Sequence, residues 1–262
     1  MSEIDLHRRF GGIARLYGPT ALAHFLQAHV AVIGVGGVGS WAVEALARSA
    51  IGELTLIDLD HVSESNINRQ LPALEPTLGR AKVRVLAERV AAIHPGCRTH
   101  PIEAMLCADN LAQWITPQLD GVLDCIDGYR DKAALIAYCR RHKIPLITTG
   151  GAGGRSDPSQ ICSGDLSRTR HDPLLSKTRK LLRHDYGFSS NPKRRFGITA
   201  VWSEEQPRAD ASAAQSHGRL QCGGYGSSMA VTASFGLLAV AELLRRIAAP
   251  ADGLPESSVT HC

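Results

Sequence analysis

Residues 29–40 have the sequence HVAVIGVGGVGS, in which a run of β-branched and small apolar residues leads directly into glycines. A continuous apolar run of this kind is typical of a strand buried on both faces of a parallel sheet. The glycines match the pattern G-x-G-x-x-G, which lets the backbone approach a phosphate closely at the positive end of the following helix. The stretch therefore predicts a strand, a phosphate-binding turn and a helix.

Strand-like and helix-like segments alternate from this stretch as far as residue 150. Apolar runs predict further strands at residues 54–60, 97–102, 121–127 and 145–150. Helical spacing predicts helices at residues 20–28, 38–50, 79–93, 109–115 and 130–143. Right-handed crossovers between parallel strands produce this alternation and place helices on both faces of the sheet. We therefore expect an α/β, Rossmann-like fold with a doubly wound, mostly parallel sheet.

The part of the chain after Gly150 does not continue this alternation. It contains a short candidate strand at 160–163, a polar segment at 203–221 and an apolar helix at 225–247. We expect an irregular extension and a closing helix. The prediction is one domain over residues 1–262, in which 1–150 form the nucleotide-binding half and 151–262 the substrate-facing half.

Composition and cysteine spacing exclude several classes of protein. Aromatic residues are 5% of the chain, too few to favour surfaces that stack single-stranded bases. The seven cysteines form no C-x-x-C pair, which argues against a four-cysteine zinc site and for reduced thiols in the cytoplasm. The N-terminus has no apolar signal segment. Met229–Leu244 is shorter than the roughly 20 residues of a membrane span and contains Glu242, so a buried helix is favoured over a membrane anchor.

Charged residues after the second predicted strand favour a nucleoside triphosphate. Asp58 is placed to accept hydrogen bonds from ribose hydroxyls, which an NAD enzyme would equally require. Asp60, Arg69 and Lys82 then follow along the chain. A dinucleotide has no terminal phosphate for two such cations, whereas the β- and γ-phosphates of ATP carry most of its charge. The combination therefore favours ATP over NAD.

Two carboxylates lie near the end of the fourth predicted strand, in the sequence Asp124-Cys125-Ile126-Asp127. Ligands of doubly wound sheets lie beyond the carboxyl ends of the strands, and a carboxylate that faces a triphosphate there is a natural Mg²⁺ ligand. Asp127 is nearer the strand end and is the preferred ligand. The role of Asp124 stays open: it is either a metal ligand or a buried structural carboxylate.

As a set, these motifs resemble those of the ubiquitin-activating-enzyme-like adenylyltransferases, which include the activators of sulfur-carrier proteins. The resemblance covers about residues 9–150. It implies that ATP and Mg²⁺ are used to adenylate a carboxylate, with release of pyrophosphate. It implies an ATP-binding set of Gly34, Gly36, Gly37, Gly39, Asp58, Asp60, Asn66, Arg69, Lys82 and Asp127.

The same resemblance implies separate roles within this set. Gly37 would lie under the phosphates and Asp58 would bind the ribose. The residues implied to hold the triphosphate are Asn66, Arg69 and Lys82, and the implied metal ligand is Asp127. The family's arginine finger, which a neighbouring subunit lends, would be Arg15 or, as the open alternative, Arg9. A homodimer is therefore expected, and the catalytic candidates are Arg15, Arg69, Lys82 and Asp127.

A narrower resemblance covers nearly the whole chain. Segments at 9–18, 132–145, 148–154 and 229–236 are similar to the bacterial tRNA threonylcarbamoyladenosine dehydratases. This branch implies that the threonyl carboxylate of the modified adenosine, next to the anticodon, is adenylated, and that the substrate's own carbamoyl group then expels AMP. Because such a nucleophile is intramolecular, the enzyme needs no thioester cysteine. Cys162 and Cys222, the cysteines considered for that role, would then be dispensable.

The basic excess of the chain lies in residues 166–195, where nine Lys and Arg against two acids give +7, although the whole chain is +4. Together with the resemblance, this favours tRNA binding over a merely solvated loop. The candidate tRNA-binding residues are Arg168, Arg170, Lys177, Arg179, Lys180, Arg183, Lys193, Arg194 and Arg195. The backbone of Gly150–Gly154 is a weaker candidate for holding a monovalent cation, with a tight turn as the default.

Two other functions compete with a tRNA dehydratase. An adenylyltransferase that activates a sulfur-carrier protein would share the ATP motif, but the missing cysteine pairs and the basic stretch oppose it. A non-catalytic nucleotide-binding scaffold is opposed by the presence of Arg69, Lys82 and Asp127. The sequence leaves open whether a cysteine desulfurase or sulfur-acceptor system is a partner.

Overall fold

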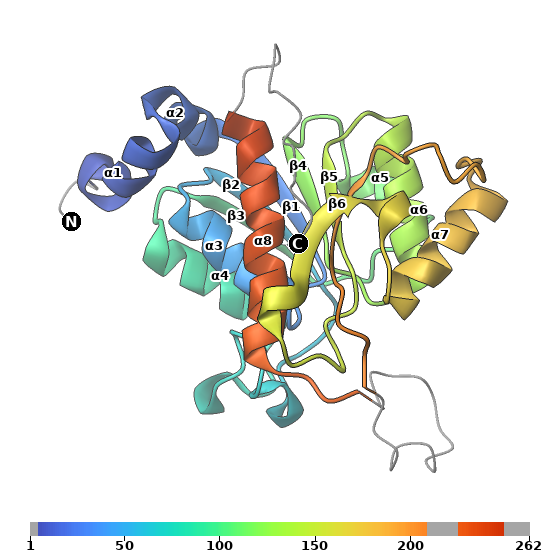
Figure 1. The fold of residues 1–262 in the computed structure, drawn as a ribbon. Helices are drawn as coiled ribbons and strands as arrows, with labels where there is room; N and C mark the ends of the chain where they lie inside the picture. The colour runs from blue at the N-terminus through green and yellow to red at the C-terminus, as the bar shows by residue number, and fades with distance from the viewer. Residues whose placement is uncertain (1–4, 209–224, 249–262) are drawn as a thin grey trace.

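The computed structural model describes residues 5–208 and 225–248. Within them, seven strands form one sheet in the order β3-β2-β1-β4-β5-β7-β6 (Figure 1). The strands are β1 (His29–Ile33), β2 (Glu53–Ile57), β3 (Arg98–Ile102), β4 (Gly121–Asp124), β5 (Leu146–Thr149), β6 (Ile161–Asp165) and β7 (Thr199–Ser203). All neighbours are parallel except β6 and β7. The strand order reverses between β1 and β4, the position where doubly wound sheets bind ligands.

Helices cover both faces of this sheet. They are α1 (Leu6–Tyr17), α2 (Pro19–Gln27), α3 (Gly39–Arg48), α4 (Lys82–Ile93), α5 (Leu111–Trp114), α6 (Tyr129–Arg141), α7 (Pro173–Asp185) and α8 (Met229–Ala248). The long helix α8 packs beside α3 on one face, and α6 packs beside α7 on the other (Figure 1). The expected Rossmann-like α/β fold is therefore confirmed.

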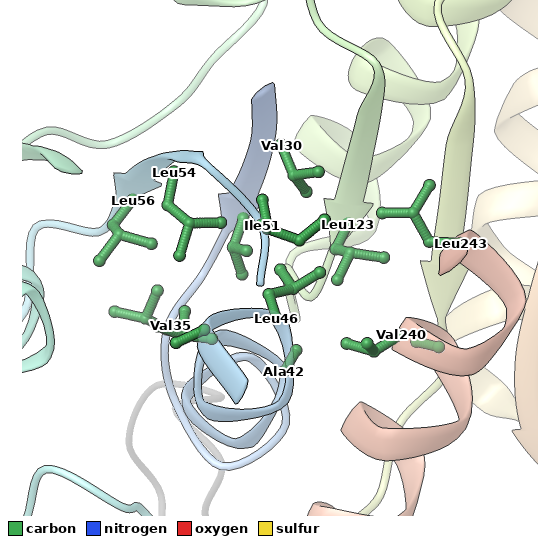
Figure 2. Packing of buried hydrophobic residues seen from close by; sticks show 14 of the residues in the cluster. Val30, Val35, Ala42, Leu46, Ile51, Leu54, Leu56, Leu123, Val240 and Leu243 are labelled. Atoms are coloured by element: carbon green, nitrogen blue, oxygen red, sulfur yellow. The ribbon is translucent and has the colours of Figure 1, made fainter. Parts of the chain in front are cut away.

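The central strand β1 shows why its sequence is apolar without interruption. Val30 and Val32 belong to the core under α3 and α8, whereas Ala31 and Ile33 belong to the core under α6 and α7. All four side chains are buried. Figure 2 shows Val30 in the first of these cores with residues from α3 and α8. A strand with helices on both faces cannot alternate apolar and polar residues, because both of its faces are buried.

The structure adds three elements that the sequence analysis did not predict. Helix α1 precedes the expected first helix, α7 lies inside the basic stretch, and β7 pairs in parallel with β5. Helix α7 had a sequence signal, because Asp172 caps its N-terminus and Pro173 occupies its first turn. Strand β7 had only five residues of pattern, which is too few to separate a strand from a buried loop.

Helix α8 is the apolar segment for which a membrane anchor was considered. It packs against the sheet and α3, and the side chain of Phe235 is fully buried there. No helix in the described ranges has the combination of length and apolar character that crossing a membrane requires. The expectation of a buried helix is therefore met by α8. The polar segment expected at 203–221 and the C-terminal tail lie largely outside the described residues.

Candidate nucleotide-binding site

The glycine loop between β1 and α3 needs glycine at two positions for steric reasons. Gly34 has φ +80°, and a Cβ atom there would lie 2.9 Å from the carbonyl oxygen of Cys125 at the end of β4. A Cβ atom on Gly39 would lie 1.9 Å from the carbonyl oxygen of Gly34. The loop is therefore pressed against the end of β4, at the point where the strand order reverses.

The other two glycines face the chain's basic and polar residues. The nearest side-chain atoms to a Cβ on Gly37 would be Thr232 Cγ2 at 3.3 Å and Arg69 Cγ at 3.5 Å. For Gly36 the nearest is Gln70 Nε2 at 3.8 Å. A side chain at Gly37 would press on Thr232 and Arg69, and one at Gly36 would approach Gln70, so glycine keeps the backbone of this loop accessible. An accessible backbone next to the basic side chain of Arg69 is compatible with the phosphate-binding turn that the sequence predicts.

Asp58 connects the glycine loop to the end of β2. Its Oδ2 accepts a 2.7 Å hydrogen bond from the N–H of Val35, and its Oδ1 accepts a 2.8 Å bond from the N–H of Asp60. Burial raises the pKa of the Asp58 carboxyl, and these two backbone donors oppose that shift. Asp58 therefore shapes the loop in addition to offering the carboxylate expected to bind ribose.

Lys82 begins α4 and reaches back to the same strand end. Its Nζ lies 2.8 Å from Asp60 Oδ2, and its backbone N–H donates to the carbonyl of Asp60. The Lys82 side chain is 5% exposed, whereas that of Asp60 is 72% exposed. The ammonium group is consequently held in one place by a partner that is itself open to solvent. Asp60 also donates its backbone N–H to Asp58, two residues earlier, so Asp58, Asp60 and Lys82 form one cluster.

Arg69 lies on the connection between β2 and α4, which contacts α3 and the residues just before α8. Its guanidinium donates to Ser65 O and Asn68 Oδ1, both at 2.9 Å, and its carbonyl accepts from Trp41 Nε1. Asn68 Nδ2 in turn donates to the carbonyl of Ser227, just before α8. The contributions of Trp41 and Ser227 were not predictable, because no sequence pattern pairs residues so far apart.

Asn66 stabilises a turn of its own loop, in addition to the triphosphate contact expected of it. It is buried, and its Oδ1 accepts a 3.2 Å hydrogen bond from the N–H of Ser63 to cap the short turn Glu64–Asn66. This turn places Arg69 beside the glycine loop. The resemblance assigned Asn66 to the triphosphate, and its amide nitrogen is the group left for that contact.

The two aspartates near the end of β4 differ completely in environment. Asp124 is fully buried, with Lys132 Nζ 2.9 Å from Oδ1 and the hydroxyl of Thr148 donating to Oδ2 over 2.7 Å. It is a structural carboxylate, which resolves the alternative left open above. Asp127 is exposed in the loop between β4 and α6, at the carboxyl edge of the sheet. An exposed carboxylate at this edge is the type of group that Mg²⁺ shares with substrate phosphates.

The two candidate arginine fingers lie on α1, at the opposite end of the sheet from the glycine loop (Figure 1). Arg9 donates to the carbonyl of Ile93 at the end of α4, and the neighbouring Phe10 ring packs edge-to-face on His94. Arg9 therefore anchors α1 to its own chain. Arg15 is exposed. Neither arginine lies at the nucleotide site of its own subunit.

The basic stretch forms a surface on and around α7. Seven of its nine cations are exposed, while Arg179 and Arg183 are partly buried. Arg179 donates to the hydroxyl of Thr169, and burial lowers its pKa. Arg183 stacks over the ring of Phe196 at 5.2 Å. We call the seven exposed residues the basic surface: Arg168, Arg170, Lys177, Lys180, Lys193, Arg194 and Arg195.

The glycines at 150–154 are explained by close packing. A Cβ on Gly150 would lie 2.1 Å from Asp172 Oδ2, and the N–H of Gly151 donates to that same oxygen over 3.0 Å. Gly154 has φ +77°, and its N–H and carbonyl both bond to neighbouring backbone, at Gly226 and Arg208. These contacts explain the glycines by packing, and the monovalent cation stays a prediction.

Cysteine chemistry has little support at this site. Cys125 lies against the glycine loop, and burial raises its pKa to about 12, so that the thiol stays protonated at neutral pH. Cys162 is half-buried on β6, where it pairs in register with Trp202. Cys222 lies outside the described residues.

Comparison with known proteins gives consistent results. A model of the ThiF family matches residues 11–260. The tRNA threonylcarbamoyladenosine dehydratase of Haemophilus influenzae is 49% identical over 251 residues, which cover 94% of this chain and 96% of the relative. A crystal structure of the Escherichia coli tRNA N6-threonylcarbamoyladenosine dehydratase in complex with ATP has a TM-score of 0.86 at 46% identity, over 94% of this chain and 97% of that one. The molybdopterin-synthase adenylyltransferase of Salmonella typhimurium is 38% identical over 47% of this chain and 49% of its own.

Proposed function

The chain belongs to the ThiF family, and on that premise we propose that it is an ATP-dependent tRNA threonylcarbamoyladenosine dehydratase. The observation that carries this proposal is the extent of the similarity. The dehydratase of Haemophilus influenzae is similar over nearly the whole chain, whereas the molybdopterin-synthase adenylyltransferase is similar over about half. The similarity to a dehydratase crystallised with ATP supports ATP as the nucleotide.

The reaction consists of an activation and a cyclisation. A carboxylate oxygen of the threonyl group attacks the α-phosphorus of ATP, the bond from that phosphorus to the bridging oxygen breaks, and pyrophosphate leaves. The carbamoyl group of the same nucleotide then attacks the acyl adenylate and loses a proton, and AMP leaves with the carboxylate oxygen. The nucleoside therefore loses the elements of one water. The nucleophile is already held next to its target, so proximity supplies the rate that a catalytic thiol would otherwise provide.

The chain's own residues would promote the first step by binding ATP and stabilising the negative charge on its phosphates. In the proposal, the backbone of the glycine loop binds phosphate oxygens and Asp58 binds the ribose. Arg69 and Lys82 bind the triphosphate and stabilise the charge on the departing pyrophosphate. The contact between Lys82 and Asp60 supports this role, because it orders the ammonium group before a nucleotide arrives.

Mg²⁺ would neutralise phosphate charge when bound, and Asp127 is the residue we assign to hold it. Its exposure at the carboxyl edge of β4 supports the assignment. Asp124 is excluded, because both of its oxygens already have buried partners in Lys132 and Thr148.

The arginine finger would come from a second copy of the chain, which makes the functional unit a homodimer. We assign the finger to Arg15 over Arg9. The assignment is supported by the hydrogen bond of Arg9 to Ile93, which commits Arg9 to its own subunit, and by the exposure of Arg15.

The tRNA would bind along the basic surface, which supplies positive charge to the phosphate backbone. Arg179 and Arg183 are removed from the contact set, because both side chains are engaged within α7 and its neighbours. A tRNA substrate would also place the enzyme in the cytoplasm.

The proposal is tested by incubating the full chain with ATP and tRNA that carries threonylcarbamoyladenosine. We expect the modified nucleoside to lose the mass of one water and ATP to yield AMP and pyrophosphate. Matched tRNA without the modification should give no such product. Formation of ADP as the main nucleotide product, or AMP release with an unchanged nucleoside, would contradict the proposal.

A further inference from the structure

A second cluster of reactive side chains lies at the opposite end of the sheet from the glycine loop. His29 is the first residue of β1, Glu53 is the first residue of β2, and His100 lies on β3. The parallel register pairs His29 with Glu53 and places His100 opposite Thr55. Since registered residues and residues two apart share a face, the three side chains project from the same side of the sheet.

The potential ligand atoms of these residues converge. His100 Nε2 lies 2.8 Å from Glu53 Oε1, and His29 Nδ1 lies 3.7 Å from the same oxygen. All three atoms lie within 4.8 Å of one another. Tetrahedral bonds of about 2.0–2.2 Å to a zinc ion space the ligand atoms by roughly 3.4 Å. His100 Nε2 and Glu53 Oε1 would therefore move slightly apart, and the more distant atoms would move closer together. No other group of three His, Cys, Asp or Glu side chains meets this distance within residues 5–208 and 225–248.

Neighbouring residues orient two of the three ligands. His29 Nε2 lies 2.8 Å from the hydroxyl of Thr55, and a proton on Nε2 leaves the lone pair of Nδ1 directed to the cluster. Arg98 binds Oε2 of Glu53 and leaves Oε1 to the two histidines. Metal-binding histidines and carboxylates are usually held in this way by outer hydrogen bonds. The Arg98 charge opposes a cation, but it sits on the other carboxylate oxygen.

We propose that His29, Glu53 and His100 form a binding site for a divalent transition-metal ion of the zinc type, with water completing the coordination. Two imidazoles and one carboxylate suit zinc and its neighbours, whereas Ca²⁺ and Mg²⁺ prefer sets of oxygen ligands. The His29 and Glu53 side chains are 25% and 16% exposed and that of His100 is 48% exposed, so an ion can enter from solvent.

The site would be structural. It shares no residue with the nucleotide site, and it joins three adjacent strands, of which β3 is an edge strand of the sheet. An ion that binds only the folded chain stabilises it by mass action. We therefore expect Zn²⁺ to raise the melting temperature of the chain without nucleotide or tRNA present.

The test uses untagged, metal-free full-length protein titrated with Zn²⁺, and with Co²⁺ as a spectroscopic probe. We expect one site per chain whose Co²⁺ complex absorbs in the visible region. His100→Ala should lower Zn²⁺ affinity by at least about 100-fold, and Thr55→Val by roughly 10–100-fold, as for the loss of an outer hydrogen bond. Glu53→Gln should also lose the site, and because Gln can still bond to Arg98, it separates ligand loss from unfolding.

His184→Ala is the matched control. His184 is an exposed histidine that also contacts a carboxylate, on Asp185, but it belongs to no three-ligand group among the described residues. It should bind Zn²⁺ like the unaltered chain. If His100→Ala and Glu53→Gln retain Zn²⁺ binding with unchanged affinity, any ion is bound elsewhere, for example by cysteines, and the proposal is wrong. The absence of Zn²⁺ binding by the unaltered chain at micromolar concentration would overturn it equally.

Discussion

The N–H of Val35, just after β1, donates a 2.7 Å hydrogen bond to Oδ2 of Asp58, just after the neighbouring strand β2. The same carboxylate accepts from the N–H of Asp60 through its other oxygen. One side chain thus sets the conformation of the glycine loop and the position of Asp60, which in turn holds Lys82. In the proposed enzyme, both the ribose contacts and the phosphate contacts of ATP would depend on this one carboxylate.

Asp58→Ala should therefore impair ATP binding by more than the loss of one ribose contact. Two backbone donors would lose their acceptor. Water can replace it at the exposed Asp60, whereas an unpaired N–H at the buried Val35 costs on the order of 1–3 kcal/mol. We expect a lower free energy of unfolding in urea and a weaker ATP-dependent thermal shift. Asp58→Asn keeps one acceptor and should be intermediate. An Asp58→Ala variant with normal ATP affinity would contradict this account.

Asp124 and Asp127 provide a contrast between stability and activity. Asp124→Ala leaves the fully buried ammonium of Lys132 without its partner, which typically costs about 3–5 kcal/mol, and should yield a poorly folded protein. Asp127→Ala should fold normally, as judged by its melting temperature, and should lose nearly all dehydration activity. Removal of both members of the buried pair, by Asp124→Leu with Lys132→Met, should recover part of the lost stability. An active Asp127→Ala enzyme would place the metal ligand elsewhere.

Cysteine variants test whether the nucleophile belongs to the substrate. Burial raises the pKa of Cys125 to about 12, so this thiol stays protonated from pH 6 to pH 10 and cannot contribute a thiolate limb to the pH–rate profile. Cys125→Ser and Cys162→Ser should each retain dehydration with the profile of the unaltered enzyme over that range. Complete loss of activity in a folded variant, or loss of an alkaline rise in rate, would favour a covalent thioester mechanism.

Arg15 can be tested by mixing two inactive enzymes. Arg15→Ala lacks the finger and Asp127→Ala lacks the metal ligand, so each homodimer should be inactive. Unfolding and refolding them together forms mixed dimers, in which one site has an intact Asp127 and receives Arg15 from the other subunit. We expect part of the activity to return in the mixture. Arg9→Ala should mainly lower the melting temperature, since Arg9 anchors α1. No recovery of activity would exclude a finger supplied in this way.

The nucleotide-binding half was predictable because its signals are local. The apolar run at 29–33 is strand β1, and the glycines that follow it and Asp58 lie at the carboxyl ends of β1 and β2. A parallel sheet brings these strand ends together whatever lies between them in the sequence. Asp124 was ambiguous for the opposite reason. Its role depends on Lys132 and Thr148, and the distinction between a buried partner and a ligand exists only after the chain has folded.

The second half was less predictable, because its contacts are distant in sequence. Strand β7 pairs with β5 in the sheet, although β6 and α7 separate the two strands in the sequence. No short sequence pattern predicts that pairing. The basic stretch illustrates the same limit. Charge counting placed nine cations there, but only packing shows that Arg179 and Arg183 are engaged within the fold.

This distinction changes how the tRNA surface should be tested. Lys177 and Lys180 are exposed on α7, whereas substituting Arg179 or Arg183 would also disturb packing. The matched control is Arg48 with Arg84, two exposed cations on α3 and α4, which lie on the other face of the sheet from α7 (Figure 1).

Lys177→Gln with Lys180→Gln should weaken tRNA binding and flatten its salt dependence, because each phosphate contact contributes roughly 0.7–0.9 to the slope of log affinity against log salt. The change should be equal for tRNA with and without the modification, since phosphate contacts position the ligand without reading bases. Thermal stabilisation by ATP should be unaffected, and Arg48→Gln with Arg84→Gln, which removes the same charge, should leave the slope in place. If both double variants lower affinity equally, binding follows net charge alone and the basic surface has no special role.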